Sequence, residues 1–222
     1  MQDDRPILAL DTGSPVVSVA LGRPGGLSTV RTLELRRSSE QLLTVIDEVL
    51  TAEDLQAEDL RGIASLRGPG SFTGLRVGLG TALGLHQALG LPAVGPSTLA
   101  ALALAATTQG AAGTEVTAAV DAMRGEWCVQ SFALDGAALT ALDTPHLVTG
   151  DALAAGPRPV VGFALEKLGD DGNAPRIEPP PLAPFAVALA AASSWDPGTL
   201  IEPIYFRPPA VTPSKKDPPP RP

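Results

Sequence analysis

Aromatic residues are scarce in this 222-residue chain. They make up 4% of it, as five Phe, two Trp and one Tyr, whereas hydrophobic residues together reach 44%. Alanine, leucine and valine must therefore fill the core, and a chain of this length can form one large or two small domains. Cysteine is almost absent, and a single Cys128 excludes an internal disulfide. It lies in an alternating, strand-like segment, so we expect a buried and inert thiol.

Basic residues are also few. The chain has 16 Lys and Arg against 24 Asp and Glu, which gives a net charge of −8. Proteins that hold nucleic acid unaided usually present a basic face that neutralises phosphates. The two small basic groups, at 31–37 and 215–221, do not form such a face. The composition therefore disfavours direct, unaided binding of nucleic acid.

Long hydrophobic runs and several catalytic motifs are missing as well. No segment reaches 18 uninterrupted apolar residues, and no basic N-terminal region precedes an apolar run. The sequence therefore predicts no membrane span, no signal peptide and a cytoplasmic location. The absence of His-x-x-x-His and Cys-x-x-Cys disfavours a zinc or iron site. Without Gly-Lys or Gly-x-Ser-x-Gly there is no Walker A loop and no serine-hydrolase elbow.

Apolar patterning predicts three strands, then alternating helices and strands, and then a second strand-rich half. Strands are predicted over 7–10, 16–21, 27–35, 62–66, 91–94, 115–120, 126–134, 139–148 and 160–162. Helices are predicted from residue 38, over 72–89, from residue 98 to about 107, and over 183–192. A three-strand meander followed by alternating units indicates an α/β fold with mixed sheets flanked by helices.

The composition also suggests where the chain divides. A Gly- and Ala-rich segment near residue 110 indicates an N-terminal subdomain over 1–108 and a smaller C-terminal subdomain over 109–207. Residues 208–222 are proline-rich and predicted to be flexible.

In the first predicted helix, Leu43 lies off the stripe of apolar residues that faces the core, so its side chain is predicted to face outward.

The string Asp11-Thr12-Gly13, after an apolar strand, is the first candidate for chemistry. In aspartic proteases this string supplies one carboxylate of a pair, but here it occurs once and near three predicted helices, which argues against that class. In actin-like ATPases and sugar kinases it forms a hairpin that faces bound phosphate. A plain turn, in which the aspartate caps its own backbone, is the other interpretation. The string alone does not decide between these two.

A glycine-rich loop at 68–74 leads directly into the helix predicted over 72–89. That helix has four interior glycines, Gly74, Gly78, Gly80 and Gly84. Each costs about 0.8–1 kcal/mol relative to alanine, so another element must approach closely and offset roughly 3–4 kcal/mol. This element is either part of the same chain or a partner protein. The loop's N–H groups are also a candidate anion site, with a closely packed helix start as the alternative.

Six motifs span nearly the whole chain: Ile7–Thr12, Ser39–Leu43, Gly68–Gly78, Pro96–Leu99, Val120–Glu126 and Pro203–Arg207. Together they resemble the TsaB (YeaZ) family of bacterial tRNA threonylcarbamoyladenosine synthesis. The most specific motif is Gly68-Pro69-Gly70-Ser71-Phe72-Thr73-Gly74-Leu75-Arg76-Val77-Gly78, although its glycines are loosely shared with the catalytic paralogue TsaD. Relatives often carry His where this chain has Ser38, which puts any contact made by that His in doubt.

The resemblance implies an actin-like ATPase fold (ASKHA, ribonuclease H-like) of two related subdomains. It also implies a non-catalytic subunit that binds and supports TsaD, together with the ATPase TsaE, during threonylcarbamoyl transfer to the tRNA adenosine beside the anticodon. Such a subunit has no cofactor of its own; ATP and metal belong to the partner subunits, and tRNA is contacted only indirectly. The alternative is a stand-alone enzyme of this fold, either an M22-like peptidase or an ATP-using enzyme.

The resemblance also implies positions for the sites. The partner surface, which also supports homodimers, is placed on the first two helices, where small residues allow close contact. Its residues are Glu40, Leu43, Phe72, Thr73, Gly74, Arg76, Val77, Gly78 and Thr81. Vestigial phosphate loops are expected at Asp11, Thr12, Gly13, Gly68 and Gly70. No catalytic residue and no metal ligand is expected in the chain.

Overall fold

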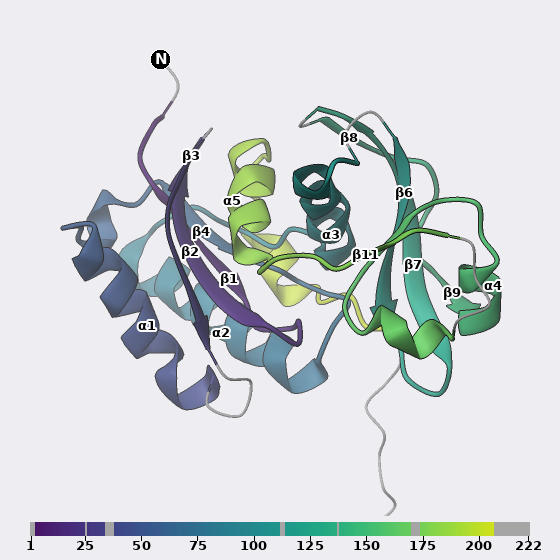
Figure 1. The fold of residues 1–222 in the computed structure, drawn as a ribbon. Coiled ribbons are helices and arrows are strands. Elements are labelled where there is room, and N and C mark those ends of the chain that lie inside the picture. Colours follow the sequence, from purple (N-terminus) through teal and green to yellow (C-terminus); the bar gives the residue numbers. More distant parts are fainter. Residues whose placement is uncertain are drawn as a thin grey trace, which may run out of the picture.

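The computed structural model describes residues 3–24, 26–33, 38–111, 114–136, 138–169 and 174–206. Two β-sheets stand side by side, with helices on their outer faces and between them (Figure 1). The predicted tail over 208–222 and the side chain of Ser38 lie outside the described residues. Among the helices of the described ranges, none has both the length and the apolar character needed to cross a bilayer.

The first sheet has the strand order β3-β2-β1-β4-β5. Its strands are β1 (Ile7–Asp11), β2 (Val17–Arg23), β3 (Gly26–Leu33), β4 (Gly62–Ser65) and β5 (Ala93–Val94). The first three form the predicted antiparallel meander, and β4 and β5 continue the sheet in parallel from β1. The sheet is therefore mixed, as predicted.

The second sheet has the order β11-β10-β6-β7-β8, and β9 also pairs with β7. Its strands are β6 (Glu115–Asp121), β7 (Glu126–Asp135), β8 (Ala138–Ala141), β9 (His146–Thr149), β10 (Val160–Val161) and β11 (Arg176–Ile177). The single strand predicted over 139–148 is wrong, because β8 and β9 are separate. Between them Asp143 accepts a hydrogen bond from the Ser131 amide (2.8 Å), and Pro145 cannot donate to a ladder.

The helices are α1 (Ser38–Ala52), α2 (Phe72–Leu89), α3 (Thr98–Ala106), α4 (Gly150–Ala154) and α5 (Ala183–Ala191). Short 3-10 turns are η2 (Ala57–Asp59), η3 (Thr107–Gln109), η4 (Leu165–Leu168) and η5 (Pro197–Ile201). Helix α2 has the predicted bounds, and its ends show why. The Ser71 hydroxyl accepts a hydrogen bond from the Gly74 amide, and Gly90 ends the helix in a left-handed conformation (φ 67°).

Alternation along β1 sets the layers of the molecule. Leu8 and Leu10 pack with the apolar stripes of α1 and α2, whereas Ile7 and Ala9 pack with α3 and α5 on the opposite face. Helix α5 follows the second sheet in sequence but packs against β1 and β2, and α3 packs against β6 (Figure 1). Position in the chain therefore does not tell which sheet a helix covers.

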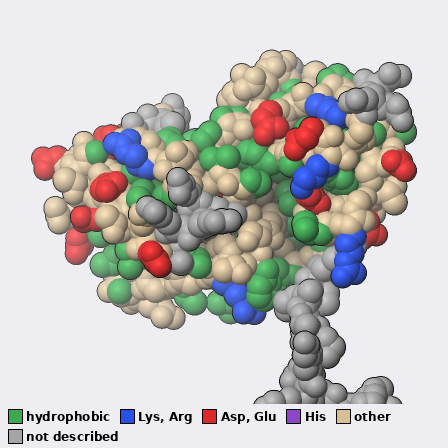
Figure 2. All heavy atoms as spheres, turned by 60° about the horizontal axis from the view of Figure 1, so that its bottom comes forward, with side chains coloured by type: hydrophobic (Ala, Val, Ile, Leu, Met, Phe, Trp, Pro, Cys, Tyr) green, Lys and Arg blue, Asp and Glu red, His purple; other side chains and the backbone are tan. Residues whose placement is uncertain are grey.

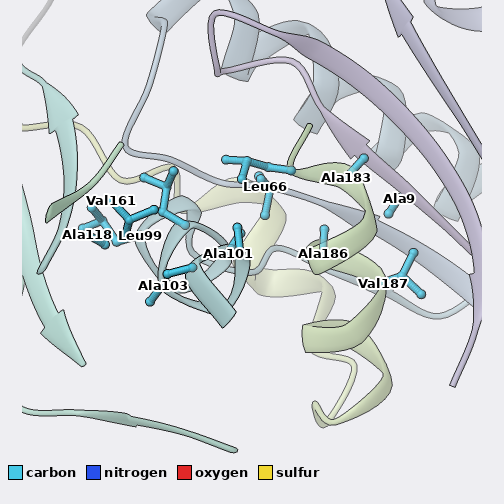
Figure 3. Packing of buried hydrophobic residues seen from close by; sticks show 14 of the residues in the cluster. Ala9, Leu66, Leu99, Ala101, Ala103, Ala118, Val161, Ala183, Ala186 and Val187 are labelled. Carbon is cyan, nitrogen blue, oxygen red and sulfur yellow. The ribbon is translucent and has the colours of Figure 1, made fainter. Parts of the chain in front are cut away.

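The layer between the two sheets is rich in alanine. In Figure 3 Ala101 of α3 faces Ala186 of α5, Ala103 lies on the side of α3 towards the second sheet, and the two sheets contribute Ala9 and Ala118. Small side chains allow helices and sheets to approach closely while the interior remains filled. As expected, alanine, leucine and valine supply most of this layer; Phe132 is its fully buried aromatic residue within the described ranges, and Phe163, Phe185, Trp195 and Phe206 pack against it partly buried.

Candidate functional site

The turn after β1 is built around the carboxylate of Asp11, which is completely buried. Its Oδ1 accepts hydrogen bonds from the amides of Gly13 (3.2 Å) and Ser14 (3.1 Å). Its Oδ2 is also buried and has no hydrogen-bond partner among the described residues. The aspartate thus caps its own turn with one oxygen, as the plain-turn interpretation requires, and leaves the other oxygen unused.

Burial controls the titration of this carboxylate. Loss of solvent raises the pKa of Asp11 from its ordinary 3.8 to about 6, against the opposing effect of hydrogen bonds from Ser14 and Gly13. A buried carboxylate with a raised pKa at the end of a strand is a candidate functional group on physical grounds. The same shift means that the ionised form lowers the stability of the folded chain.

Helix α2 packs against this turn through two of its glycines, Gly74 and Gly78. The Thr12 hydroxyl donates to the Gly74 carbonyl (2.7 Å), and the Ser71 amide donates to the Gly13 carbonyl (2.8 Å). A Cβ at Gly74 would overlap the Thr12 carbonyl oxygen, and a Cβ at Gly78 would overlap the Thr12 hydroxyl and lie 3.1 Å from Ser65 Oγ. The close approach that offsets these two glycines is therefore internal.

This contact corrects part of the predicted partner surface. Gly74 and Gly78 are both buried in the chain's own interior, so the prediction that they face a partner is wrong. The physical reason is that the turn after β1 occupies the groove that the missing side chains leave. The two outward glycines of α2 are instead Gly80 and Gly84, which are exposed and would have no described atom within 4 Å of an added Cβ.

The other predicted interface residues lie at or near the surface. Glu40, Thr73 and Arg76 are exposed, and Leu43 exposes 64% of its surface, which confirms its predicted outward position. Phe72, Val77 and Thr81 are partly buried. Whether these residues bind a partner stays a prediction.

Of the predicted phosphate-loop residues, Asp11, Thr12 and Gly68 stay outside, whereas Gly13 and Gly70 line a cleft between a first lobe, built on the β1–β5 sheet and α3, and a second lobe, built on the β6–β11 sheet. Its volume is about 380 Å³. The first lobe contributes residues of the turn after β1, the glycine loop and the ends of α2 and α3: Gly13, Ser14, Pro15, Pro69, Gly70, Ser71, Phe72, Thr98 and Leu102. Figure 2 shows a hollow between the two lobes, bordered in part by hydrophobic side chains.

The second lobe contributes polar residues that the sequence-based site did not include. Asp121 at the end of β6 accepts a hydrogen bond from the Met123 amide through Oδ1 and one from Lys167 Nζ through Oδ2, each 2.7 Å long. Asp121, Met123 and Lys167 all line the cleft. The motif at 120–126 signalled the aspartate, but no local pattern marked Lys167, which comes from η4.

The polar residues that line this cleft are Ser14, Ser71, Thr98 and the Asp121–Lys167 pair; the hydroxyls of Ser14 and Thr98 are buried and have no hydrogen-bond partner among the described residues. Asp11 lies behind the turn and does not line the cleft. Within the described ranges, no three or more His, Cys, Asp or Glu side chains gather in a way that could hold a metal ion. Cys128 is buried, as predicted, and burial raises the pKa of its thiol to about 12.

A family model described as TsaD, tRNA N6-adenosine threonylcarbamoyltransferase, matches residues 29–192. The chain belongs to this family. Among solved structures, YeaZ from Pseudomonas aeruginosa is similar, with a TM-score of 0.76 and 26% identity over 90% of this chain and 99% of that one. The fold is of the actin-like ATPase type, which confirms the fold class expected from the sequence.

Two curated relatives have the same name, tRNA threonylcarbamoyladenosine biosynthesis protein TsaB. The one from Escherichia coli K12 is 40% identical over 54% of this chain and 52% of the relative. The one from Haemophilus influenzae is 41% identical over 54% of this chain and 50% of the relative. The matched part thus spans about half the length of these relatives. The resemblance to the TsaB (YeaZ) family is confirmed.

Proposed function

We propose that this chain is an accessory, non-catalytic subunit in the synthesis of threonylcarbamoyladenosine in tRNA. In this role it binds and supports a TsaD catalytic subunit, in a cytoplasmic complex that also includes the ATPase TsaE. The observation that carries the proposal is the similarity to two proteins named for this biosynthesis, together with the YeaZ fold over 90% of the chain. ATP and metal belong to the partner subunits in this proposal, and tRNA is contacted only through them.

The geometry of the turn after β1 supports a non-catalytic role. Asp11 and Thr12, which belong to the string expected to form a vestigial phosphate loop, are turned into the protein here. Asp11 holds two amides of its own turn, and the Thr12 hydroxyl binds the Gly74 carbonyl. The Thr12 contact fastens α2 to the turn after β1, and the Asp11 contacts hold the turn itself, so both side chains have a structural use.

Reconstitution tests the proposal. Purified TsaD and TsaE, supplied with threonylcarbamoyl-adenylate and tRNA, are assayed for modified adenosine with and without the chain, and the chain's binding to TsaD is measured by calorimetry. We expect product formation to depend on the chain and a complex to form. No complex, even with nucleotide and TsaE present, would refute the proposed role.

The variant Asp11→Asn separates this role from that of a stand-alone enzyme. Asparagine retains an oxygen that can accept the Gly13 and Ser14 amides, so the turn is preserved, but it lacks the carboxylate. An accessory subunit should support TsaD equally well with either residue. ATP or peptide turnover by the isolated chain that is lost in Asp11→Asn would instead establish the chain as an enzyme.

A further inference from the structure

The cleft between the two lobes is lined largely by aromatic, proline and other apolar side chains. Phe72, Phe163, Pro15 and Pro69 belong to its lining, and Met123 joins them with 67% of its surface exposed. Its volume of about 380 Å³ is at the small end of ligand sites in proteins. Aromatic-lined grooves accept short proline-rich segments, which enter them as extended helices that are already formed. The lining of the cleft thus suits a few residues of such a segment.

The described chain ends beside this cleft. The Tyr205 ring lies 5.0 Å from the ring of Phe72, which lines the cleft. Phe206 packs against the buried cluster that contains Leu102, another lining residue. In Figure 1 the last described residues, drawn in yellow, lie between the two sheets. The C-terminal tail, residues 208–222, begins two positions after Phe206 and therefore starts next to the cleft.

The glycine loop fixes this starting point. The Ile204 amide donates to the Arg67 carbonyl (2.8 Å), and Arg67 Nη1 donates to the Glu202 carbonyl (3.3 Å). Gly68 has a φ of +104°, and a Cβ there would lie 2.7 Å from the Ile204 carbonyl oxygen. The loop therefore needs glycine to admit the segment before the tail, and it holds that segment against the first lobe.

The tail has the composition that such a cleft accepts. Seven of its fifteen residues are proline. It also has three basic residues and one acid, and hence a net charge of +2: Lys215, Lys216, Arg221 and Asp217. Because the whole chain carries −8, the other 207 residues carry −10. Opposite charge therefore attracts the tail to the body of its own chain.

Two carboxylates on the second lobe lie where the lysines of the tail could bind. Glu166 precedes Lys167, which lines the cleft and is itself paired with Asp121. Partial desolvation raises the pKa of Glu178, and repulsion from Glu166 raises it further, so these two exposed carboxylates lie within each other's field. Among the described residues, neither takes part in an ion pair. Two like charges without a cation are stabilised by a nearby lysine.

We propose that the C-terminal tail occupies the interlobe cleft of its own chain, with prolines against the aromatic lining and Lys215 and Lys216 beside the Glu166–Glu178 pair. Lys215 follows Phe206 by nine residues, a span of about 28 Å in an extended proline helix. The tail then fills the cleft from within, keeps small ligands out and connects the two lobes. This inference goes beyond the proposed function and does not depend on it.

A paramagnetic label in the full-length chain tests the proposal. Cys128 is the one cysteine of the sequence and is buried, so Ser214→Cys provides an accessible thiol for a nitroxide in the middle of the tail. We expect the amide NMR signals of Met123 and Phe163 to lose most of their intensity when the nitroxide is oxidised. The signal of Leu43 on α1, away from the cleft, should keep its intensity.

Reversal of charge tests the lysine contacts. In the labelled chain, Lys215→Glu combined with Lys216→Glu should restore most of the lost intensity, because like charges then face each other. Adding Glu166→Lys and Glu178→Lys should bring the loss of intensity back, since both sides are then reversed.

A matched control reverses two other acids. Asp47→Lys and Glu48→Lys, at exposed positions of α1, change the net charge by the same amount but lie away from the cleft. Added to the chain with the reversed lysines, they should not bring the loss of intensity back. Circular dichroism verifies that each variant is folded.

Three outcomes would overturn the inference. Unchanged signals of Met123 and Phe163 would show that the tail lies elsewhere. Loss of intensity in an unlabelled chain mixed with nitroxide-labelled chain would show that the tail enters the cleft of a second copy. Recovery of the contact by the α1 reversal as well would show general charge attraction without a defined site. The experiment uses no partner protein, so none of these outcomes bears on the proposed function.

Discussion

Two glycines of α2, Gly74 and Gly80, should respond to alanine in opposite directions. Gly80 faces open space, with no described atom within 4 Å of an added Cβ. Gly80→Ala should therefore show only the helix-propensity gain, about 0.8–1 kcal/mol in the free energy of unfolding. For a chain of this size that gain raises the melting temperature by about 2–4 °C.

Gly74→Ala places the same methyl group against backbone that cannot move aside cheaply. The new Cβ would overlap the Thr12 carbonyl oxygen and lie 2.9 Å from the Thr12 carbonyl carbon. Overpacking a filled site costs about 1–3 kcal/mol. Displacing Thr12 also weakens its hydrogen bond to Gly74, worth about 0.5–1.5 kcal/mol. Subtracting the helix-propensity gain of alanine leaves a net loss of about 2 kcal/mol in the free energy of unfolding. That loss lowers the melting temperature by about 4–8 °C.

Thermal and urea unfolding, followed by circular dichroism at one pH, measure both variants against the unaltered chain. The comparison is internal, because the substitution, the helix and the assay are the same. If Gly74→Ala is as stable as Gly80→Ala, the reasoning is refuted, because that result would mean that α2 does not pack against the turn after β1. It would also restore Gly74 as a residue available to a partner.

Three further predictions concern buried groups. Asp11 has a folded pKa of about 6 against an ordinary 3.8, so its contribution to stability is present at low pH and is lost as pH rises from about 4 to 6. Asp11→Asn should abolish that loss of stability, which amounts to about 3 kcal/mol, so the variant should be more stable than the unaltered chain at pH 7.5. If urea unfolding of the variant and of the unaltered chain depends on pH in the same way, the prediction is contradicted. Thr12→Val should cost about 1–2 kcal/mol, because the Gly74 carbonyl loses its buried donor, while Thr12→Ser should cost less; the same urea assay measures both. The Cys128 thiol should react with a thiol reagent at pH 8 only after unfolding, and rapid labelling of the folded chain would refute its inert role.

Local patterns predicted the elements of this fold well where one rule dominated. The bounds of α2 follow from a serine at its start and a glycine after its end, both of which act within one helical turn. The single strand predicted over 139–148 fails for a comparable local reason, because Asp143 and Pro145 interrupt the segment between β8 and β9. Short elements such as β11 and α4 have too few residues to show a period.

The candidate site was predictable in part. The sequence named the turn at Asp11 and the glycine loop, and the structure brings both to one cleft. It did not indicate Lys167 or the support that Tyr205 gives to Phe72, since both contacts join residues far apart in the chain. No window of neighbouring residues contains such information.

The sequence by itself determined which residues share a face of α2, because helical periodicity fixes that from spacing alone. It also determined that the glycines on this helix need a close neighbour to offset their conformational cost. Only the tertiary structure decided that the neighbour of Gly74 and Gly78 is Thr12 of the same chain, and that Gly80 and Gly84 face outward. The reason is physical: periodicity describes a helix relative to its own axis, whereas the identity of what packs against each side depends on how the rest of the chain folds around it.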